Sequence, residues 1–275
     1  AVLISFSRRY PNVRESWSVI ASFIKFGLII SMVPGVLAGV TYEWTLFQIT
    51  DTIGFTLRAD SAGILFACLA ALLWIPINFY SIGYMRCNNE HEQTGYFAAF
   101  AICMSSVMGI AMASNLLTFF FFYELLTIAS YPLVLHKRNE EALLASRKYL
   151  IYTLISGQLF LAGLVAVYCI SGTMDFKAGG FLTTDMAPTW QLQLIFLIMI
   201  LAGSVKAAVM PLHGWLPAAM IAPTPVSALL HAVAVVKTGV FAVLRIIGFV
   251  FGPKLLADIG TADILAWFAA GSIII

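Results

Sequence analysis

Residues 204–230 read SVKAAVMPLHGWLPAAMIAPTPVSALL, and this stretch decides how the chain folds. It is apolar but holds four prolines and a glycine, and its first break residues are Pro211, Gly214 and Pro217. A proline inside a helix removes a backbone hydrogen bond and clashes with the preceding turn. We therefore expect a helix that starts near Leu192 to break around residues 210–215 and to resume as a short piece. The alternative is an ordinary helix ending in a proline-rich loop, because proline is common just past helix ends.

The composition on either side of this stretch is that of a membrane protein. The 275 residues are 61% hydrophobic and 10% charged, with a mean hydropathy of +0.95. A soluble domain carries about 25% charged residues. The net charge of +2 is small, and no basic stripe alternates with aromatic residues. The composition therefore favours a polytopic membrane protein and excludes a nucleic-acid partner.

Runs of about 20 apolar residues mark helices that can cross a bilayer. The sequence predicts an all-α polytopic protein with about nine transmembrane segments, of which the first and the last are cut. A remnant ends near Phe6, and the other expected spans are 17–40, 61–85, 96–112, 116–135, 149–170, 192–210, 226–251 and 264–275. Because both ends fall inside apolar helices, we expect the chain to be part of a longer one.

The charges of the loops predict the topology. Loops 7–16 and 136–148 are basic, whereas loops 41–60 and 171–190 lean acidic. Cytoplasmic loops are enriched in lysine and arginine. We therefore expect loops 1, 3, 5 and 7 to be cytoplasmic in a multi-pass protein of the cell (inner) membrane. Loops 3 and 7 themselves add no support, since loop 3 is neutral to acidic and loop 7 is uncharged.

Three ionisable residues lie deep inside expected spans: Glu124, Lys206 and Lys237. A charge at the centre of a transmembrane helix costs roughly 2.5–3.5 kcal/mol on insertion scales, so such residues face a bundle interior or water and form pairs. Glu124 and Lys206 have opposite signs and predict a pair in which each charge controls the proton affinity of the other. The alternative for Lys206 is that its long stem snorkels to the interface.

The span 226–251 carries two candidate proton carriers, His231 and Lys237. Lys237 lies roughly 17 Å from either end of its span at 1.5 Å per residue, which is too far for snorkelling. His231 is as well explained by a structural role as by a relay. In a regular helix the two side chains lie on different faces, so a relay needs a bulged helix or a bridging water. His213, inside the expected break, is a candidate for proton access from the cytoplasm.

No motif in the sequence indicates catalysis. The four cysteines and four histidines show no CxxC or HxxxH spacing, and we find no nucleophile triad and no phosphate-binding glycine loop. We therefore expect no cofactor, no metal site and no catalytic chemistry in this chain.

Three stretches together resemble the antiporter-like membrane subunits: YSIGYM (80–85), FFFYELLTIASYPLVLH (120–136) and KAAVMPLHGWLPAAMIAPTPVSALLHAVAVVKTGVFAVLR (206–245). This family comprises the large membrane subunits of respiratory complex I, of group-4 membrane-bound hydrogenases and of Mrp-type cation/proton antiporters. The sequence HAVAVVKTGVF is most similar to the D-type subunit of Mrp antiporters or to a hydrogenase relative.

The resemblance implies two inverted five-helix repeats. Residues 1–95 would then be N-terminal helices, 96–251 the first repeat and 252–275 the start of the second. It also implies that Glu124 matches the family's glutamate on the fifth helix and Lys206 the lysine on the broken seventh. Lys237 and His231 match the relay positions of the eighth helix. The implied partners are the other membrane subunits of an Mrp, complex I-like or hydrogenase complex.

The residues and the resemblance lead to one hypothesis and two alternatives. The hypothesis is a proton-translocating subunit of a multi-subunit complex, with Na⁺ as a second candidate ion. This would be the pumping subunit where the parent complex is an NADH:quinone oxidoreductase or a hydrogenase. The first alternative is a self-contained transporter of a small solute that binds at the broken helix. The second is a membrane scaffold for a redox complex, without transport.

Overall fold

The structure is a computed structural model, and it describes residues 1–49 and 53–274. The chain folds mainly into helices, which confirms the predicted fold class. Within the described residues, seven helical stretches are long and apolar enough to cross a membrane. These are α2 (Pro11–Leu37), α3 (Ser61–Cys87), α4 (Gln93–Ala111), α5 (Leu116–Val134), α6 (Glu140–Ser171), α7 (Thr189–Lys206) and the composite helix Thr224–Phe251.

Three shorter helices complete the two ends of the chain. They are α1 (Val2–Phe6), α11 (Pro253–Asp258) and α12 (Thr261–Ile274). The last expected span, 264–275, therefore corresponds to α12, and Ile275 lies outside the described residues.

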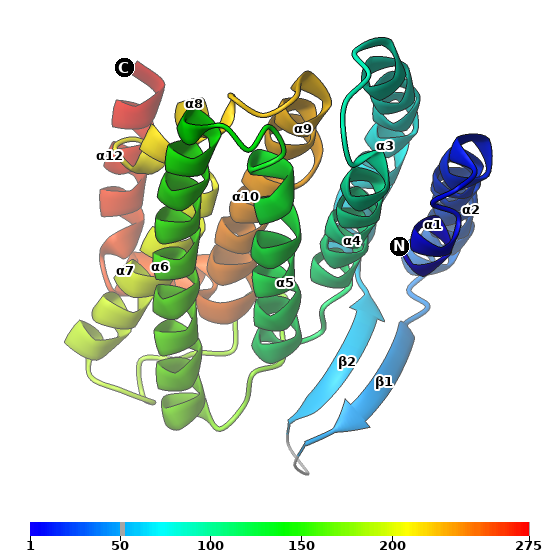
Figure 1. The fold of residues 1–275 in the computed structure, drawn as a ribbon. Coiled ribbons are helices and arrows are strands. Elements are labelled where there is room, and N and C mark those ends of the chain that lie inside the picture. Colours follow the sequence, from blue (N-terminus) through cyan, green and yellow to red (C-terminus); the bar gives the residue numbers. More distant parts are fainter. Residues whose placement is uncertain (50–52, 275) are drawn as a thin grey trace.

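The long helices lie side by side and alternate in direction (Figure 1). The turns before α2, α4 and α6 lie at one end of the bundle, together with α8 and α9. A β-hairpin and the connections before α5 and α7 lie at the other end. Loops 1, 3, 5 and 7 thus share one end, as the charge pattern predicts. That this end faces the cytoplasm stays a prediction.

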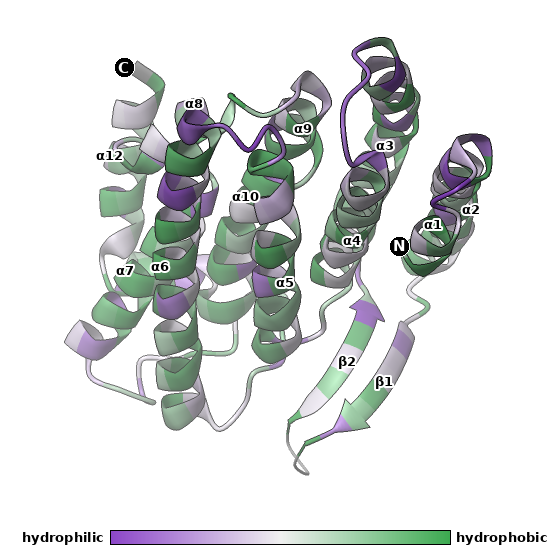
Figure 2. Ribbon diagram, in the orientation of Figure 1, coloured by the Kyte–Doolittle hydropathy of each residue, from purple (hydrophilic) through white to green (hydrophobic). Residues whose placement is uncertain are grey.

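Apolar residues make up most of the length of the helices, and polar residues gather near the helix ends (Figure 2). Large apolar side chains such as Leu65, Ile128 and Leu144 are exposed on three different helices. In water such a surface would drive aggregation, whereas in a bilayer it is solvated by lipid. Only 17% of the apolar window of α2 is buried, against 56% for α4, so α2 lies at the edge of the bundle.

Side-chain caps fix where several helices begin. The Asp60 carboxylate accepts the Gly63 amide at the start of α3 (2.7 Å), and Asn115 and Asn139 accept amides at the starts of α5 and α6 (2.8 Å each). These oxygens satisfy backbone donors that have no partner inside the helix. The Asn139 cap places the start of α6 at Glu140, nine residues before the expected start at Tyr149.

The helix break is confirmed and starts just before the prolines. α7 ends at Lys206, and the chain resumes as a 3₁₀ turn, η1 (Leu212–Gly214), and a short helix, α8 (Trp215–Ala219). The Trp215 indole donates a hydrogen bond to the Val205 carbonyl (2.8 Å). This bond satisfies a carbonyl that the interrupted helix leaves free.

The composite helix Thr224–Phe251 is irregular. It consists of α9 (Thr224–Ala228), a π-helical segment η2 (Leu229–Val233), α10 (Val235–Arg245) and a second π-helical segment η3 (Ile246–Phe251). π-Helical turns inside α-helices are rare and occur frequently at functional sites. The chain is therefore bulged at His231, before Lys237, and a bulge is one of the two conditions under which a relay between them is expected.

The expected loop 41–60 is wrong in one respect, because most of it is a β-hairpin. Strand β1 (Tyr42–Gln48) pairs antiparallel with β2 (Gly54–Ala59), and residues 50–52 between them lie outside the described part of the chain. β2 packs on α5, where the Phe55 ring meets Phe121 edge-on at 4.9 Å. The aromatic and β-branched residues of YEWTLFQ favour a strand, whereas the charges of the segment alone indicate only a loop.

Candidate functional site

Lys206, the last residue of α7, is the centre of the candidate site. Its side chain is fully buried, at 0% exposure. The Nζ atom donates a hydrogen bond to the backbone carbonyl of Tyr123 (2.5 Å) and lies 3.3 Å from the centroid of the Tyr123 ring. The snorkelling alternative is therefore wrong, since the amine points into the bundle and ends against α5.

Glu124 follows Tyr123 on α5 but points to another helix. Its carboxylate lies over Gly157 of α6, where a Cβ atom would overlap both carboxylate oxygens. Glu124 also lines a groove of about 700 Å³ whose other walls are apolar, among them Phe120 and Phe121. Its Oε1 atom is buried and accepts no hydrogen bond from any described residue. Apolar side chains, among them phenylalanines, therefore line the groove beside this carboxylate.

Glu124 and Lys206 form no direct ion pair within the described structure. The two groups interact electrostatically, but Lys206 donates to the carbonyl of the preceding residue instead. Successive residues of an α-helix point about 100° apart. Because Tyr123 faces α7, Glu124 is turned toward α6. The direct pairing expected from the opposite charges is thus wrong. Lys206 contacts Tyr123, and the carboxylate of the next residue, Glu124, points to another helix.

A hydroxyl network fixes the helices around Lys206. The hydroxyls of Tyr123 and Ser156 lie 2.9 Å apart, and both hydrogen-bond the Ala202 carbonyl, at 3.2 and 2.8 Å respectively. All three residues belong to different helices, α5, α6 and α7. Sequence reasoning missed Ser156 and Gly157 because nothing in the pattern of α6 shows which residues face Glu124.

α10 passes directly behind Lys206 but does not turn Lys237 toward it. A Cβ atom on Gly239 would lie 2.6 Å from the Lys206 carbonyl carbon, so glycine allows the two backbones to touch. Lys237 itself is exposed on the outer face of α10. His231 is half-buried, and its Nε2 atom has no hydrogen-bond partner among the described residues. The structure brings Glu124 and Lys206 together, and places Lys237 at the surface.

The break lies near α6, at the end of the bundle that carries the turns before α2, α4 and α6, which we call the polar end. Pro211 and Pro217 are exposed, and His213 is half-buried with a buried Nδ1 atom that has no partner in the described chain. A Cβ atom on Gly214 would lie 3.5 Å from the Tyr152 hydroxyl and 3.6 Å from the Lys148 amine. The break therefore brings Gly214, the residue after His213, close to polar groups of α6.

Lys25 is an intramembrane cation that sequence reasoning missed. It lies within the expected span 17–40, so the rule that identified Lys206 applies to it too. Its Nζ atom is buried, has no hydrogen-bond partner among the described residues, and lies 3.6 Å from the centroid of the Trp74 ring. The amine is thus held by a cation–π contact between α2 and α3.

An ion pair anchors the far end of α10. Arg245 is buried and forms a bidentate pair with Asp60, the residue that caps α3. Its guanidinium also lies 4.6 Å from the centroid of the Phe249 ring. The pair ties the helix that carries Lys237 to α3.

Comparisons with known proteins identify relatives of this chain. The family model described as "NADH:quinone oxidoreductase/Mrp antiporter, TM" matches residues 113–275. The A-type Na(+)/H(+) antiporter subunit of Alkalihalophilus pseudofirmus is 30% identical over 251 residues, which cover 90% of this chain and 31% of that protein. The D-type Na(+)/H(+) antiporter subunit of Bacillus subtilis is 25% identical over 277 residues, covering 100% of this chain and 55% of that protein.

Two solved complexes contain chains of the same fold. A chain of the archaeal membrane-bound sulfane sulfur reductase superposes with a TM-score of 0.76 at 22% identity, over 89% of this chain and 51% of that one. A chain of the Mrp complex from Dietzia sp. superposes with a TM-score of 0.74 at 20% identity, over 89% and 45%. The sequence thus spans about half, or less, of the proteins it matches.

Proposed function

Because this chain belongs to the NADH:quinone oxidoreductase/Mrp antiporter transmembrane family, we propose that it is a proton-translocating subunit of a multi-subunit membrane complex. The relatives named above are antiporter subunits, and the similar structures come from membrane complexes. Na⁺ is the second candidate ion, since two of those relatives are Na(+)/H(+) antiporter subunits.

The observation that carries the proposal is the environment of Lys206. This fully buried amine contacts a neutral carbonyl and an aromatic ring, and no carboxylate of the described residues is directly bonded to it. The proton affinity of such an amine depends strongly on nearby charges, because little water screens them. The nearest candidate is Glu124, whose Oε1 atom accepts no hydrogen bond within the described residues. This arrangement lets a movement of one carboxylate load or unload one proton.

In the proposed step, Glu124 moves between two positions. Over Gly157 it leaves Lys206 to the Tyr123 carbonyl, and turned toward α7 it pairs with the Lys206 ammonium. Pairing retains the proton on Lys206, and separation releases it. A proton transfer is thereby linked to a side-chain rotation rather than to any covalent chemistry.

We propose that His213 admits the proton at the helix break and that His231 passes it toward Lys237. The π-helical bulge η2, which contains His231, supports this path, because a π-helical turn frees backbone groups that can hold water. Lys237 receives the proton at the outer face of α10. The odd-numbered loops would face the cytoplasm, and residues 96–251 would form one repeat.

A scaffold without transport gives no reason to bury Lys206, because burying an amine carries a free-energy cost that an apolar residue avoids. The solute-transporter alternative predicts uptake by this chain expressed alone. The proposed function predicts transport only in the assembled complex.

The test is proton transport by the intact complex in inverted membrane vesicles, read from the quenching of a pH-sensitive dye. Glu124→Gln and Lys206→Met should each reduce the initial rate at least tenfold. Glu141→Gln, which changes an exposed carboxylate in the first turn of α6, is the matched control and should leave the rate unchanged. Undiminished transport in both site variants would sink the proposal.

A further inference from the structure

Two histidines and a glutamate meet at the polar end of the bundle, away from the Lys206 site. Glu90 and His91 lie in the turn between α3 and α4, and His136 lies just after α5. One potential ligand atom from each lies within 4.8 Å of the other two. The two histidines are far apart in the sequence, so no HxxxH-type spacing announces them. The sequence-based expectation of no metal site did not take this folded arrangement into account.

His136 is the fixed member of this cluster. It is 7% exposed, and its ring stacks on His91 with centroids 4.8 Å apart and meets Tyr96 edge-on at 5.6 Å. Its Nε2 atom has no hydrogen-bond partner in the described residues and points toward the Glu90 carboxylate at 3.5 Å. A buried nitrogen without a hydrogen bond is rare in folded proteins, and this atom is available to bind an ion.

An imidazole binds a metal ion in its neutral form, through the lone pair of an unprotonated ring nitrogen.

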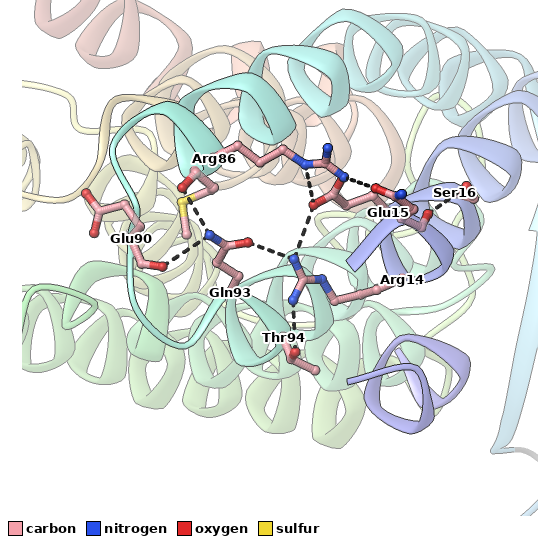
Figure 3. A network of polar contacts seen from close by, with 9 residues as sticks. Arg14, Glu15, Ser16, Arg86, Glu90, Gln93 and Thr94 are labelled. Atoms are coloured by element: carbon pink, nitrogen blue, oxygen red, sulfur yellow. Dashed lines mark hydrogen bonds and ion pairs between the residues drawn. The ribbon is translucent and has the colours of Figure 1, made fainter. Parts of the chain in front are cut away.

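The backbone of Glu90 is held by hydrogen bonds within the turn, while its carboxylate faces the His136 imidazole at 3.5 Å. Its amide donates to the Met85 carbonyl (3.1 Å), and its carbonyl accepts from the Gln93 side chain (3.2 Å). Gln93 is fixed in turn by Arg14, whose guanidinium donates to Oε1 (2.7 Å). Figure 3 shows the Glu90 carboxylate directed away from this network. Hydrogen bonds thus fix the backbone of the turn, and the Glu90 carboxylate, which would bind an ion, takes no part in them.

We propose that Glu90, His91 and His136 bind one divalent transition-metal ion of the zinc class. Two imidazoles and one carboxylate suit Zn²⁺, Co²⁺ or Ni²⁺, whereas Mg²⁺ and Ca²⁺ prefer oxygen ligands alone. Ligand atoms around a tetrahedral Zn²⁺ lie roughly 3.4 Å apart, so the widest separation in the cluster, which is at most 4.8 Å, must shrink by up to about 1.4 Å. His91 is exposed and Glu90 half-buried, so both side chains can close onto the fixed His136. The exposed side leaves a coordination position for water.

The ion would fasten the turn between α3 and α4 to the end of α5. An ion pair between Glu92 and Arg138 (2.5 Å) already joins the same two segments at the surface. The metal would act beside it, at the buried His136. Because α5 also carries Glu124, occupancy would restrain the polar end of the helix that bears the candidate carboxylate.

Metal binding is tested on the purified intact complex with Co²⁺ as the probe, followed by competition with Zn²⁺. Co²⁺ bound by imidazole and carboxylate in a four- or five-coordinate site gives visible d–d absorption. We expect one equivalent per chain that Zn²⁺ displaces. His91→Gln, Glu90→Gln and His136→Gln should each weaken this equivalent at least tenfold. The matched control Glu141→Gln, a carboxylate at the same end of the bundle, should keep it.

His91→Gln makes the result decisive even if the variant of the buried His136 misfolds, since His91 is exposed. The proposal is overturned if no Co²⁺ equivalent appears, or if an equivalent appears that His91→Gln and Glu90→Gln leave unchanged. Proton transport plays no part in this readout, so the metal site stands or falls separately from the proposed function.

Discussion

Lys206 donates its hydrogen bond to the backbone of Tyr123, and the carboxylate of the next residue, Glu124, rests on a different helix. The residue that binds the amine and the residue whose charge would neutralise it are therefore consecutive on α5 but face different helices. A main-chain carbonyl moves little, whereas a glutamate side chain has several rotamers. The pair consequently has a fixed half and a mobile half.

Tyr123 variants should separate its ring from its hydroxyl. Tyr123→Phe keeps the ring under Lys206 and removes the hydroxyl that bonds Ser156 and Ala202. We expect a loss of about 1 kcal/mol in the free energy of unfolding, because one buried network is broken while the fold is kept, and transport should persist. Tyr123→Ala also removes the ring and should reduce transport severely. Thermal unfolding and vesicle transport measure the two effects, and equal transport in both variants would contradict the role of the ring.

Gly157→Ala should act on Glu124 without touching it chemically. The added Cβ atom would occupy the space of the carboxylate and force it to turn elsewhere. We expect at least a tenfold loss of proton transport with little loss of assembled complex. Gly83→Ala is the control, because a Cβ atom there meets nothing within 4 Å. If the two alanine variants transport equally well, the position of the carboxylate over Gly157 is not essential.

The buried Asp60–Arg245 pair should contribute to stability as a unit. Removing one partner of a buried ion pair costs about 3–5 kcal/mol, because the other charge is left uncompensated. We expect Arg245→Met to lower the unfolding free energy by that order, and Asp60→Asn to cost less because the cap on α3 partly survives. The double variant should be more stable than the sum of the single losses predicts. Additive losses, measured by thermal unfolding, would show that the two residues act independently.

Lys25→Met should raise the thermal stability of the complex. The substitution removes a buried amine that has no hydrogen-bond partner in the described chain and keeps an apolar stem of similar length. Burying an unbonded polar group costs on the order of 1–3 kcal/mol, so its removal should recover part of that. Differential scanning measures the shift. A fall in stability would mean that the contact with Trp74 outweighs the cost of burial.

The stability of the polar end should depend on pH through His136. Its pKa is lowered in the folded chain, chiefly by burial, so near its ordinary value the unfolded chain binds more protons than the folded one. Stability is then fully present above about pH 6.5 and is lost as the pH falls through the folded-state pKa. With a chelator present, the melting temperature should fall between pH 7 and 5, and His136→Gln should reduce that fall. A pH dependence identical in both proteins would exclude His136 as its source.

Hydropathy alone predicts most of the fold, and the prolines predict the break. Both signals are local, because a bilayer demands long apolar helices and a proline disturbs only its own turn. The β-hairpin is missed because only the charges of segment 41–60 were considered, and not the strand preference of its aromatic and β-branched residues. Long-range side-chain geometry is missed too. No property of the sequence around Glu124 tells whether its carboxylate faces α6 or α7.

The site residues divide in the same way. The prediction that Lys206 lies in an apolar interior is confirmed, since burial of a charge follows from the span that contains it. Lys25 obeys the same rule, and applying that rule to the expected span 17–40 would have identified it. The meeting of His91 and His136 depends on how two turns fold toward each other, and no spacing encodes that.

A π-helical segment lies on each side of α10, η2 before it and η3 after it. Each wide turn interrupts the 3.6-residue repeat. A π-helical turn holds about one residue more than an α-helical turn, so deleting one residue from η2 would restore a continuous repeat and leave the residues beyond it on nearly the same faces. The bulge therefore absorbs an extra residue without turning Lys237 to another face, and what it changes is the backbone beside His231.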